Sequence, residues 1–153
     1  MSQGKGTRRT NETYDTLLEL KAAGLVAASA AGSLILDLGG GGQTWPAVWF
    51  GDLIVDVSAI EVASLDEGFT IVLSGSSSPT FASGIEEIAR LTIGSVVGMG
   101  AAATVVSDIG RYVIPVCNER NGRTYRYFRI FTIVAGTIAT GINYSARLGR
   151  MVY

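Results

Sequence analysis

Residue types that could carry catalytic chemistry are few in this chain of 153 residues. It contains no histidine and a single cysteine, Cys117. The lack of histidine excludes a Cys/His zinc site and any catalytic triad with a histidine base. Cys117 follows the apolar run 113–116, which is typical of a small core or edge residue rather than of a nucleophile. A lone cysteine cannot form an intrachain disulfide, so we expect a fold that does not depend on oxidation.

Two pairs of adjacent carboxylates, Asp66-Glu67 and Glu86-Glu87, are the next candidates. Glycosidase chemistry needs two acids that face each other about 5–10 Å apart. Neighbours on a strand point to opposite faces, so neither pair converges by itself. Neither pair has the spacing of an EF-hand calcium loop. We therefore expect these acids to be solvated or paired with arginine.

Glycine and tryptophan mark two further loop features. The run Gly39–Gly42 lacks the lysine and the helix start that a phosphate-binding loop requires, which favours an ordinary flexible loop. Trp45, Trp49 and Phe50 follow it closely. An exposed aromatic platform for sugar is one interpretation. A plug at the end of a sandwich, or an interface anchor, is the interpretation we favour.

Charge is unevenly distributed along the chain, although the net charge is only −1. Residues 15–87 hold ten acids and one lysine, whereas residues 111–150 hold seven arginines and one acid. A basic surface for nucleic acid is one interpretation. The favoured one is that early acidic strands pair with late basic strands, because distant halves of a β-sandwich become neighbours. We therefore expect no nucleic-acid partner.

The pattern of short apolar runs predicts an all-β chain. Charged residues make up 16% of the sequence, below the usual ~25%, and glycine is abundant at 20 residues. The uncharged run 22–36 is too short to span a membrane, so no membrane partner is expected. Alternation predicts eight strands that form one antiparallel β-sandwich of jelly-roll type at residues 14–153: Tyr14–Leu20, Ser33–Leu38, Leu53–Glu61, Phe69–Ser74, Glu86–Ile93, Arg111–Cys117, Tyr125–Val134 and Ile142–Met151.

One of these strands carries aromatic residues on both faces. Phe128 and Ile130 share one face, whereas Tyr127, Arg129 and Phe131 share the other. We expect the first face to fill the core and the second to meet another surface. The turn signal Asn121-Gly122 predicts that the strands on either side of it, Arg111–Cys117 and Tyr125–Val134, form a hairpin.

The stretch "GFTIVLSGSSSPTFASGIEEIARLTIG" and the later "YRYFRIFTIVAGTIATG" carry a family resemblance. Together with the early "DLGGGG", they resemble tailed-phage capsid decoration proteins, also called cement proteins. The resemblance covers roughly residues 34–148. It implies a jelly-roll fold, subunits associated as dimers or trimers, and binding to the major capsid protein on the outer surface of the virion, after assembly in the host cytoplasm. It implies no cofactor, no metal and no enzymatic activity.

The resemblance also gives a role to the polar connector between two strands. Pro79 would fix its backbone, and Phe81 would fold back as an apolar anchor. The candidate interface residues are Lys5, Arg8, Arg9, Trp45, Trp49, Phe81, Tyr127, Arg129 and Phe131. The first three lie in a flexible polar N-terminal arm, residues 1–13, which is either a disordered tail without a role or an arm that orders on a partner surface. The alternative function is a carbohydrate- or receptor-binding module of a virion.

Overall fold

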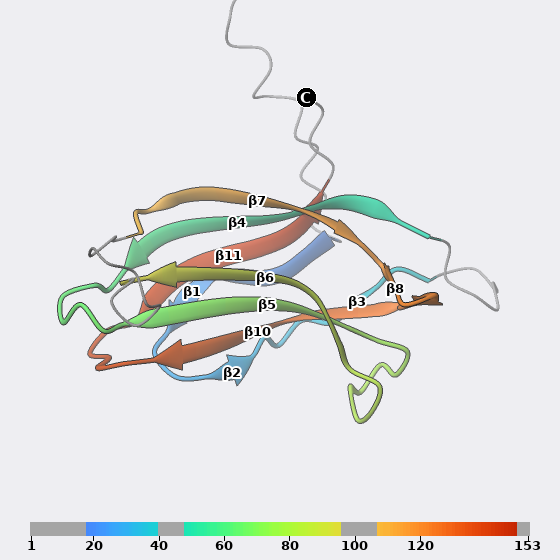
Figure 1. The fold of residues 1–153 in the computed structure, drawn as a ribbon, viewed down its shortest axis with the longest axis horizontal. Helices are drawn as coiled ribbons and strands as arrows, with labels where there is room; N and C mark the ends of the chain where they lie inside the picture. Colours follow the sequence, from blue (N-terminus) through green and yellow to red (C-terminus); the bar gives the residue numbers. More distant parts are fainter. Residues whose placement is uncertain (1–17, 40–47, 96–106, 150–153) are drawn as a thin grey trace, which may run out of the picture.

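Eleven β-strands form two antiparallel sheets and one small hairpin in the computed structural model, which describes residues 18–39, 48–95 and 107–149. The sheets lie on one another as two layers (Figure 1). In spatial order, sheet A contains β1 (Glu19–Val26), β11 (Ile142–Gly149), β4 (Phe50–Ile60) and β7 (Gly110–Cys117). Sheet B contains β2 (Ala30–Ala31), β10 (Tyr127–Ala135), β5 (Gly68–Ser76) and β6 (Glu86–Gly94), with β3 (Leu36–Asp37) also paired to β10. The hairpin joins β8 (Glu119–Arg120) to β9 (Arg123–Thr124).

Most connections cross from one sheet to the other. Among the longer strands, β4 lies in sheet A, β5 in sheet B, β7 in sheet A and β10 in sheet B. Among these longer strands of the described residues, only β5 and β6 follow one another and pair directly. As a result each sheet joins early strands to late ones, with β1 beside β11 and β5 beside β10. The predicted all-β sandwich is confirmed.

Strict alternation in the sequence explains which side chains enter the core. Ile142, Tyr144, Ala146 and Leu148 on β11 are at most 2% exposed. On the facing sheet, Phe69, Ile71 and Leu73 of β5 are fully buried, and Phe128 and Ile130 of β10 are at most 1% exposed. A period of two places these residues on the inner face of each strand. The core face predicted for the strand with Phe128 and Ile130 is confirmed.

The first predicted strand is displaced along the chain. Its predicted range ended at Leu20, whereas β1 runs from Glu19 to Val26, through alanine and glycine residues of low strand propensity. Pairing with β11 outweighs that propensity, and two register shifts accommodate the irregular chain. Lys21 stabilises the bulge, since its Nζ donates to the carbonyls of Ala22, Gly24 and Tyr144 at 3.0, 3.0 and 2.9 Å.

The predicted hairpin around Asn121-Gly122 is wrong in its strands but correct in its turn. Both residues have positive φ, at 52° and 74°, as a two-residue type I′ turn requires. However, the turn joins only the two-residue strands β8 and β9. The longer strands on either side lie in different sheets, because β7 pairs with β4 and β10 pairs with β5.

Two carboxylate side chains stabilise the loop between β10 and β11 by hydrogen bonds. Glu61 accepts hydrogen bonds from the backbone N–H groups of Ala139, Thr140 and Gly141 at 2.9, 2.7 and 2.6 Å. These bonds lower the pKa of Glu61 to about 2. Asp66 likewise accepts from the backbone N–H of Thr137 at 3.1 Å and from its hydroxyl at 2.9 Å.

Candidate interaction surfaces

The polar connector between β5 and β6 is ordered around a buried aromatic ring. Phe81 is 5% exposed and has a left-handed backbone, with φ of 53°. Its backbone N–H donates to the carbonyl of Ser78 at 3.2 Å. The fully buried Ser76 donates to the carbonyl of Ser83 at 3.1 Å and closes the base of the connector. The predicted anchoring role of Phe81 is confirmed, and its ring is therefore not an exposed contact group in the isolated chain.

A cation covers this anchor. The guanidinium carbon of Arg129 lies 4.3 Å from the centroid of the Phe81 ring. The Arg129 side chain is half-buried, and its Nε is enclosed without a hydrogen-bond partner among the described residues. Arg129 points outward from β10, because its neighbours Phe128 and Ile130 point into the core. The connector is thus folded against the outer face of sheet B.

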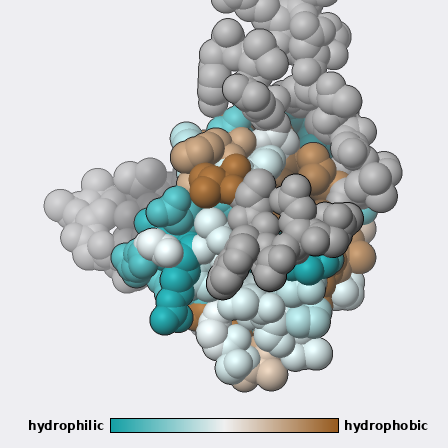
Figure 2. Space-filling view, turned by 90° about the vertical axis from the view of Figure 1, so that its right-hand side faces the viewer, coloured by the Kyte–Doolittle hydropathy of each residue, from teal (hydrophilic) through white to brown (hydrophobic). Residues whose placement is uncertain are grey.

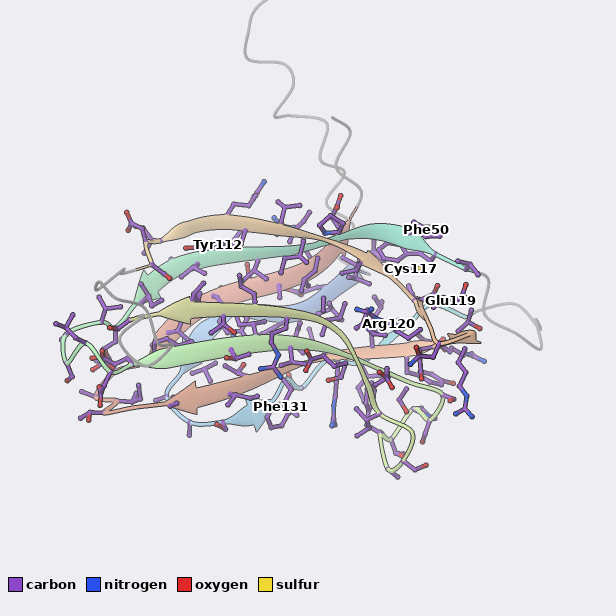
Figure 3. The ribbon with its side chains drawn as sticks, in the orientation of Figure 1. Phe50, Tyr112, Cys117, Glu119, Arg120 and Phe131 are labelled. Carbon is purple, nitrogen blue, oxygen red and sulfur yellow. The ribbon has the colours of Figure 1, made fainter. Side chains whose placement is uncertain are left out.

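The outer face of β10 remains partly apolar. Tyr127 and Phe131 are half-buried, and Ile133 is 36% exposed. Figure 3 shows Phe131 on the sheet B layer, away from the residues labelled on β7. The register places Phe131 beside Val72 of β5, which in turn lies beside Arg90 of β6. The structure thus brings together the predicted interface residues Tyr127, Arg129 and Phe131, with Phe81 packed beneath Arg129.

Early acids and late arginines pair as the charge distribution predicted. Asp56 of β4 accepts from Arg111 of β7 at 2.6 Å and from Arg147 of β11 at 2.7 Å. Burial disfavours the Asp56 carboxylate, but the two arginines outweigh it, so the pKa of Asp56 lies below its usual value. Asp37 pairs with Arg126 at 2.6 Å, and that hydrogen bond likewise lowers the pKa of Asp37. Three of the seven late arginines are therefore paired with two early acids within the sandwich.

The adjacent carboxylates are structural rather than convergent. Glu87 forms an ion pair with Arg90 at 2.7 Å, in line with the predicted use. Glu67 was expected to be solvated or paired with arginine, and this is wrong, because it is fully buried. Its carboxylate accepts from the backbone N–H groups of Ser64 at 2.6 Å and Asp66 at 3.2 Å, and so it closes the turn before β5.

Trp49 and Phe50 have different environments. Trp49 packs against the core, and its backbone N–H donates to Asn118 Oδ1 at 2.6 Å. This matches the predicted plug and leaves Trp49 unsuited to be an exposed sugar platform. Phe50 is 70% exposed, the most exposed of the large hydrophobic side chains among the described residues.

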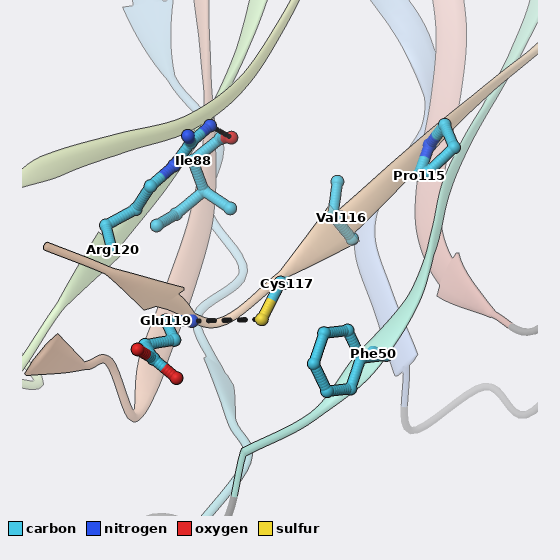
Figure 4. Close-up of a pocket in the computed structure, with 7 residues that line it drawn as sticks. All are labelled: Phe50, Ile88, Pro115, Val116, Cys117, Glu119 and Arg120. Carbon is cyan, nitrogen blue, oxygen red and sulfur yellow. Dashed lines mark hydrogen bonds between the residues drawn. The ribbon is translucent and has the colours of Figure 1, made fainter. Parts of the chain in front are cut away.

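A recess of about 310 Å³ opens beside Phe50 (Figure 4). Its lining comes from β4, β6, β7 and the start of the β8–β9 hairpin, and consists of Phe50, Ile88, Pro115, Val116, Cys117, Glu119 and Arg120. Arg120 donates to the carbonyl of Ile88 at 2.6 Å and ties the hairpin to β6. Figure 2 looks onto this end of the sandwich, where hydrophobic patches lie among hydrophilic ones. The recess thus combines apolar side chains with the charged Glu119 and Arg120.

This recess was not predicted from the sequence. Its walls include the edge strands β6 and β7 of two different sheets, together with β4 and β8, and this arrangement could not be derived from local patterns. The one local signal was the exposed aromatic Phe50 ahead of a strand. Cys117 lies in the wall, where its Sγ accepts from the backbone N–H of Glu119 at 3.4 Å.

Several predicted positions lie outside the described residues, namely Lys5, Arg8, Arg9, Trp45 and most of the run Gly39–Gly42. Within the described ranges, no group of three or more Cys, Asp or Glu side chains is placed to hold a metal ion. In the same part of the chain, no helix has the length and hydrophobicity to cross a membrane.

Comparison with known proteins found no matching family model and no significantly similar curated protein.

Proposed function

We propose that this chain is a non-enzymatic virion structural protein of the phage decoration type, which binds the outer surface of a capsid and cements neighbouring major capsid protein subunits. One observation carries the proposal. The two stretches that resemble decoration proteins are distant in sequence, yet they form β5, its connector, β6 and β10, which adjoin in sheet B. The resemblance therefore falls on one continuous surface rather than on scattered segments.

The strand order supports a jelly-roll assignment. In sheet A the first and last strands of the chain, β1 and β11, lie side by side. In sheet B the second strand, β2, lies beside the last but one, β10. Such nesting of early strands with late ones is what two Greek keys wound into a sandwich produce. The jelly roll is in turn the architecture that the resemblance implies.

Stabilisation of the shell would follow from mass action. A protein that binds only the assembled lattice stabilises it by about 2.7 kcal/mol per site at a free concentration one hundred times Kd. The effect is repeated at every site on the particle. No covalent chemistry is needed, so a chain without histidine suits this role.

Co-sedimentation with capsids tests the proposal. The purified chain is mixed with expanded capsids, unexpanded procapsids and free capsid protein of the phage that encodes it. We expect saturable binding to expanded capsids alone, together with a higher temperature of capsid disruption. Equal recovery of the chain in the pellet with and without capsids would exclude the proposed function.

A further inference from the structure

We propose that Arg129, stacked on Phe81 at the outer face of sheet B, binds a carboxylate side chain in an acidic segment of the capsid protein. This inference rests on the proposed function and names the chemistry of the contact. It is distinct from the fold's own ion pairs, because Arg129 has no carboxylate partner among the described residues. Three features of the surroundings of Arg129 support this contact.

The first feature is that Arg129 is held in place before any ligand arrives. Phe81 supports the guanidinium plane at 4.3 Å, and Phe81 is itself locked in the connector at 5% exposure. A planar cation fixed on an aromatic ring loses little side-chain entropy when it pairs with an anion. Preorganisation of this kind is what a binding residue needs and what a freely rotating surface arginine lacks.

The second feature is the contrast with other arginines of the same molecule. Arg90, Arg111 and Arg126 each bind one carboxylate through Nε and Nη2, at distances between 2.6 and 3.2 Å. Arg129 makes no such pair within the described ranges, and its buried Nε donates no hydrogen bond. Because Nε is covered, an incoming carboxylate would reach the terminal guanidinium nitrogens.

The third feature is that the surrounding face does not neutralise the charge. The register aligns Arg129 with Ser74 and then with Glu87, two strands and thus roughly 10 Å away. Glu87 is already held by Arg90 at 2.7 Å. Tyr127 and Phe131 flank Arg129 on its own strand, and a partly apolar frame strengthens an ion pair that forms there.

The outer face of sheet B does not suit nucleic acid or sugar as a ligand. Binding to nucleic acid draws on several phosphate contacts, whereas Arg126 and Arg90 on this face are already paired. A sugar platform needs open aromatic faces, but Arg129 covers Phe81 and Arg126 lies 5.1 Å from the ring of Tyr127. A single unpaired guanidinium suits one carboxylate of a protein chain.

Matched variants in the capsid-binding assay test the inference. Arg129→Gln should raise the Kd for expanded capsids about tenfold or more, and Arg129→Lys should restore only part of the loss, because it keeps the charge without the fork. Arg90→Gln removes the same charge from the same face, but from an arginine already neutralised, and should change the Kd by less than about threefold. Equal weakening by Arg129→Gln and Arg90→Gln, or no weakening by Arg129→Gln, would overturn the inference while leaving the proposed function intact.

A titration of the wild-type chain needs neither capsids nor a folded variant. The Nε–H resonance of Arg129 is followed by NMR while Ac-Glu-Glu-Glu-amide or trigalacturonate is added. The glutamate peptide should shift this resonance more than that of Arg90, and raised salt should reverse the shift. A response to trigalacturonate alone would identify an acidic glycan instead and overturn the inference. Failure of the wild-type chain to bind capsids would contradict the proposed function, but this titration would still report on Arg129.

Discussion

Thr132 Oγ1 and Tyr144 Oη lie 2.5 Å apart and join the two sheets by a hydrogen bond through the core. Thr132 belongs to β10 of sheet B and Tyr144 to β11 of sheet A, and both are at most 2% exposed. Burial raises the pKa of Tyr144 to about 12, even though the bond to Thr132 acts in the opposite direction. The phenol therefore stays neutral across the physiological range, and either hydroxyl can be the donor in this contact.

Removal of both hydroxyls should destabilise the fold by less than the sum of the two single removals. Tyr144→Phe leaves the Thr132 hydroxyl buried without a partner and should lower the free energy of unfolding by about 1–3 kcal/mol. Tyr144→Phe combined with Thr132→Val should cost clearly less than the sum of the single changes. Urea denaturation of the four proteins gives the coupling energy. Strict additivity would mean that the hydroxyls do not bond in solution.

Low pH should reduce the free energy of unfolding, in part because Glu61 becomes protonated. Its pKa is about 2 in the folded chain, against an ordinary value of 4.5. A depressed pKa stabilises the fold above the unfolded value, and this contribution is lost as the pH falls from about 4.5 towards 2. Glu61→Gln should therefore show a smaller decline in unfolding free energy across that window.

Denaturant titrations at several pH values between 2.5 and 7 measure this difference. Asp108→Asn is a suitable control, because among the described residues the Asp108 carboxylate accepts a backbone hydrogen bond only from its own neighbour Ile109. It should follow the wild-type curve more closely than Glu61→Gln does. Superimposable curves for Glu61→Gln and wild type would show that the three backbone bonds to Glu61 do not persist in solution.

Two glycines with positive φ should differ sharply in their tolerance of alanine. Gly141 has φ of 97°, and an added Cβ would lie 2.1 Å from the carbonyl oxygen of Val26. Gly84 has φ of 62° and open space around it. Gly84→Ala should cost about 1 kcal/mol from backbone strain alone, and Gly141→Ala should exceed that by 2 kcal/mol or more. Thermal unfolding of both variants separates the steric term from the backbone term.

How much of this fold could be predicted depends on where its determinants lie. Local alternation sufficed for β4, β5, β10 and β11, because one face of each is core. It failed for β1, whose alanine and glycine residues have little strand preference and whose position depends on β11. It also failed for the hairpin at Asn121-Gly122, because a turn signal does not say which strands it joins.

Parts of the candidate surfaces were predictable for the same reason. The outward row Tyr127, Arg129 and Phe131 follows from a period of two once Phe128 and Ile130 are assigned to the core. The anchoring of Phe81 was expected from the family resemblance rather than from a local pattern. The stack of Arg129 on Phe81, and the recess beside Phe50, depend on contacts between segments far apart in sequence, which local patterns do not contain.

The N-terminal arm, residues 1–13, should contribute to capsid binding by more than charge. Exposed ion pairs contribute only about 0–1 kcal/mol each, whereas ordering each residue costs about 1–2 kcal/mol. Lys5, Arg8 and Arg9 alone could not offset that cost, so backbone hydrogen bonds such as those of strand addition would be needed. Deletion of residues 1–13 should therefore weaken capsid binding more than the triple change of these cations to alanine. Equal capsid affinity of the deletion variant and the full chain would show that the arm has no part in binding.

Self-association should depend on Phe50. A 70% exposed phenylalanine is unfavourable in water, and the recess beside it, of about 310 Å³ and lined by both apolar and charged side chains, has room for an aromatic side chain of a second copy. Light scattering of the wild-type chain at micromolar concentration should give the mass of a dimer or trimer. Phe50→Ser should shift this mass towards the monomer without loss of β-sheet circular dichroism.

Leu25→Ser is the matched control, because Leu25 on β1 is 60% exposed but does not line the recess. This variant should leave the mass unchanged. A monomeric wild-type chain would contradict the predicted oligomer, and a Phe50→Ser variant of unchanged mass would place the contact between copies elsewhere on the sandwich.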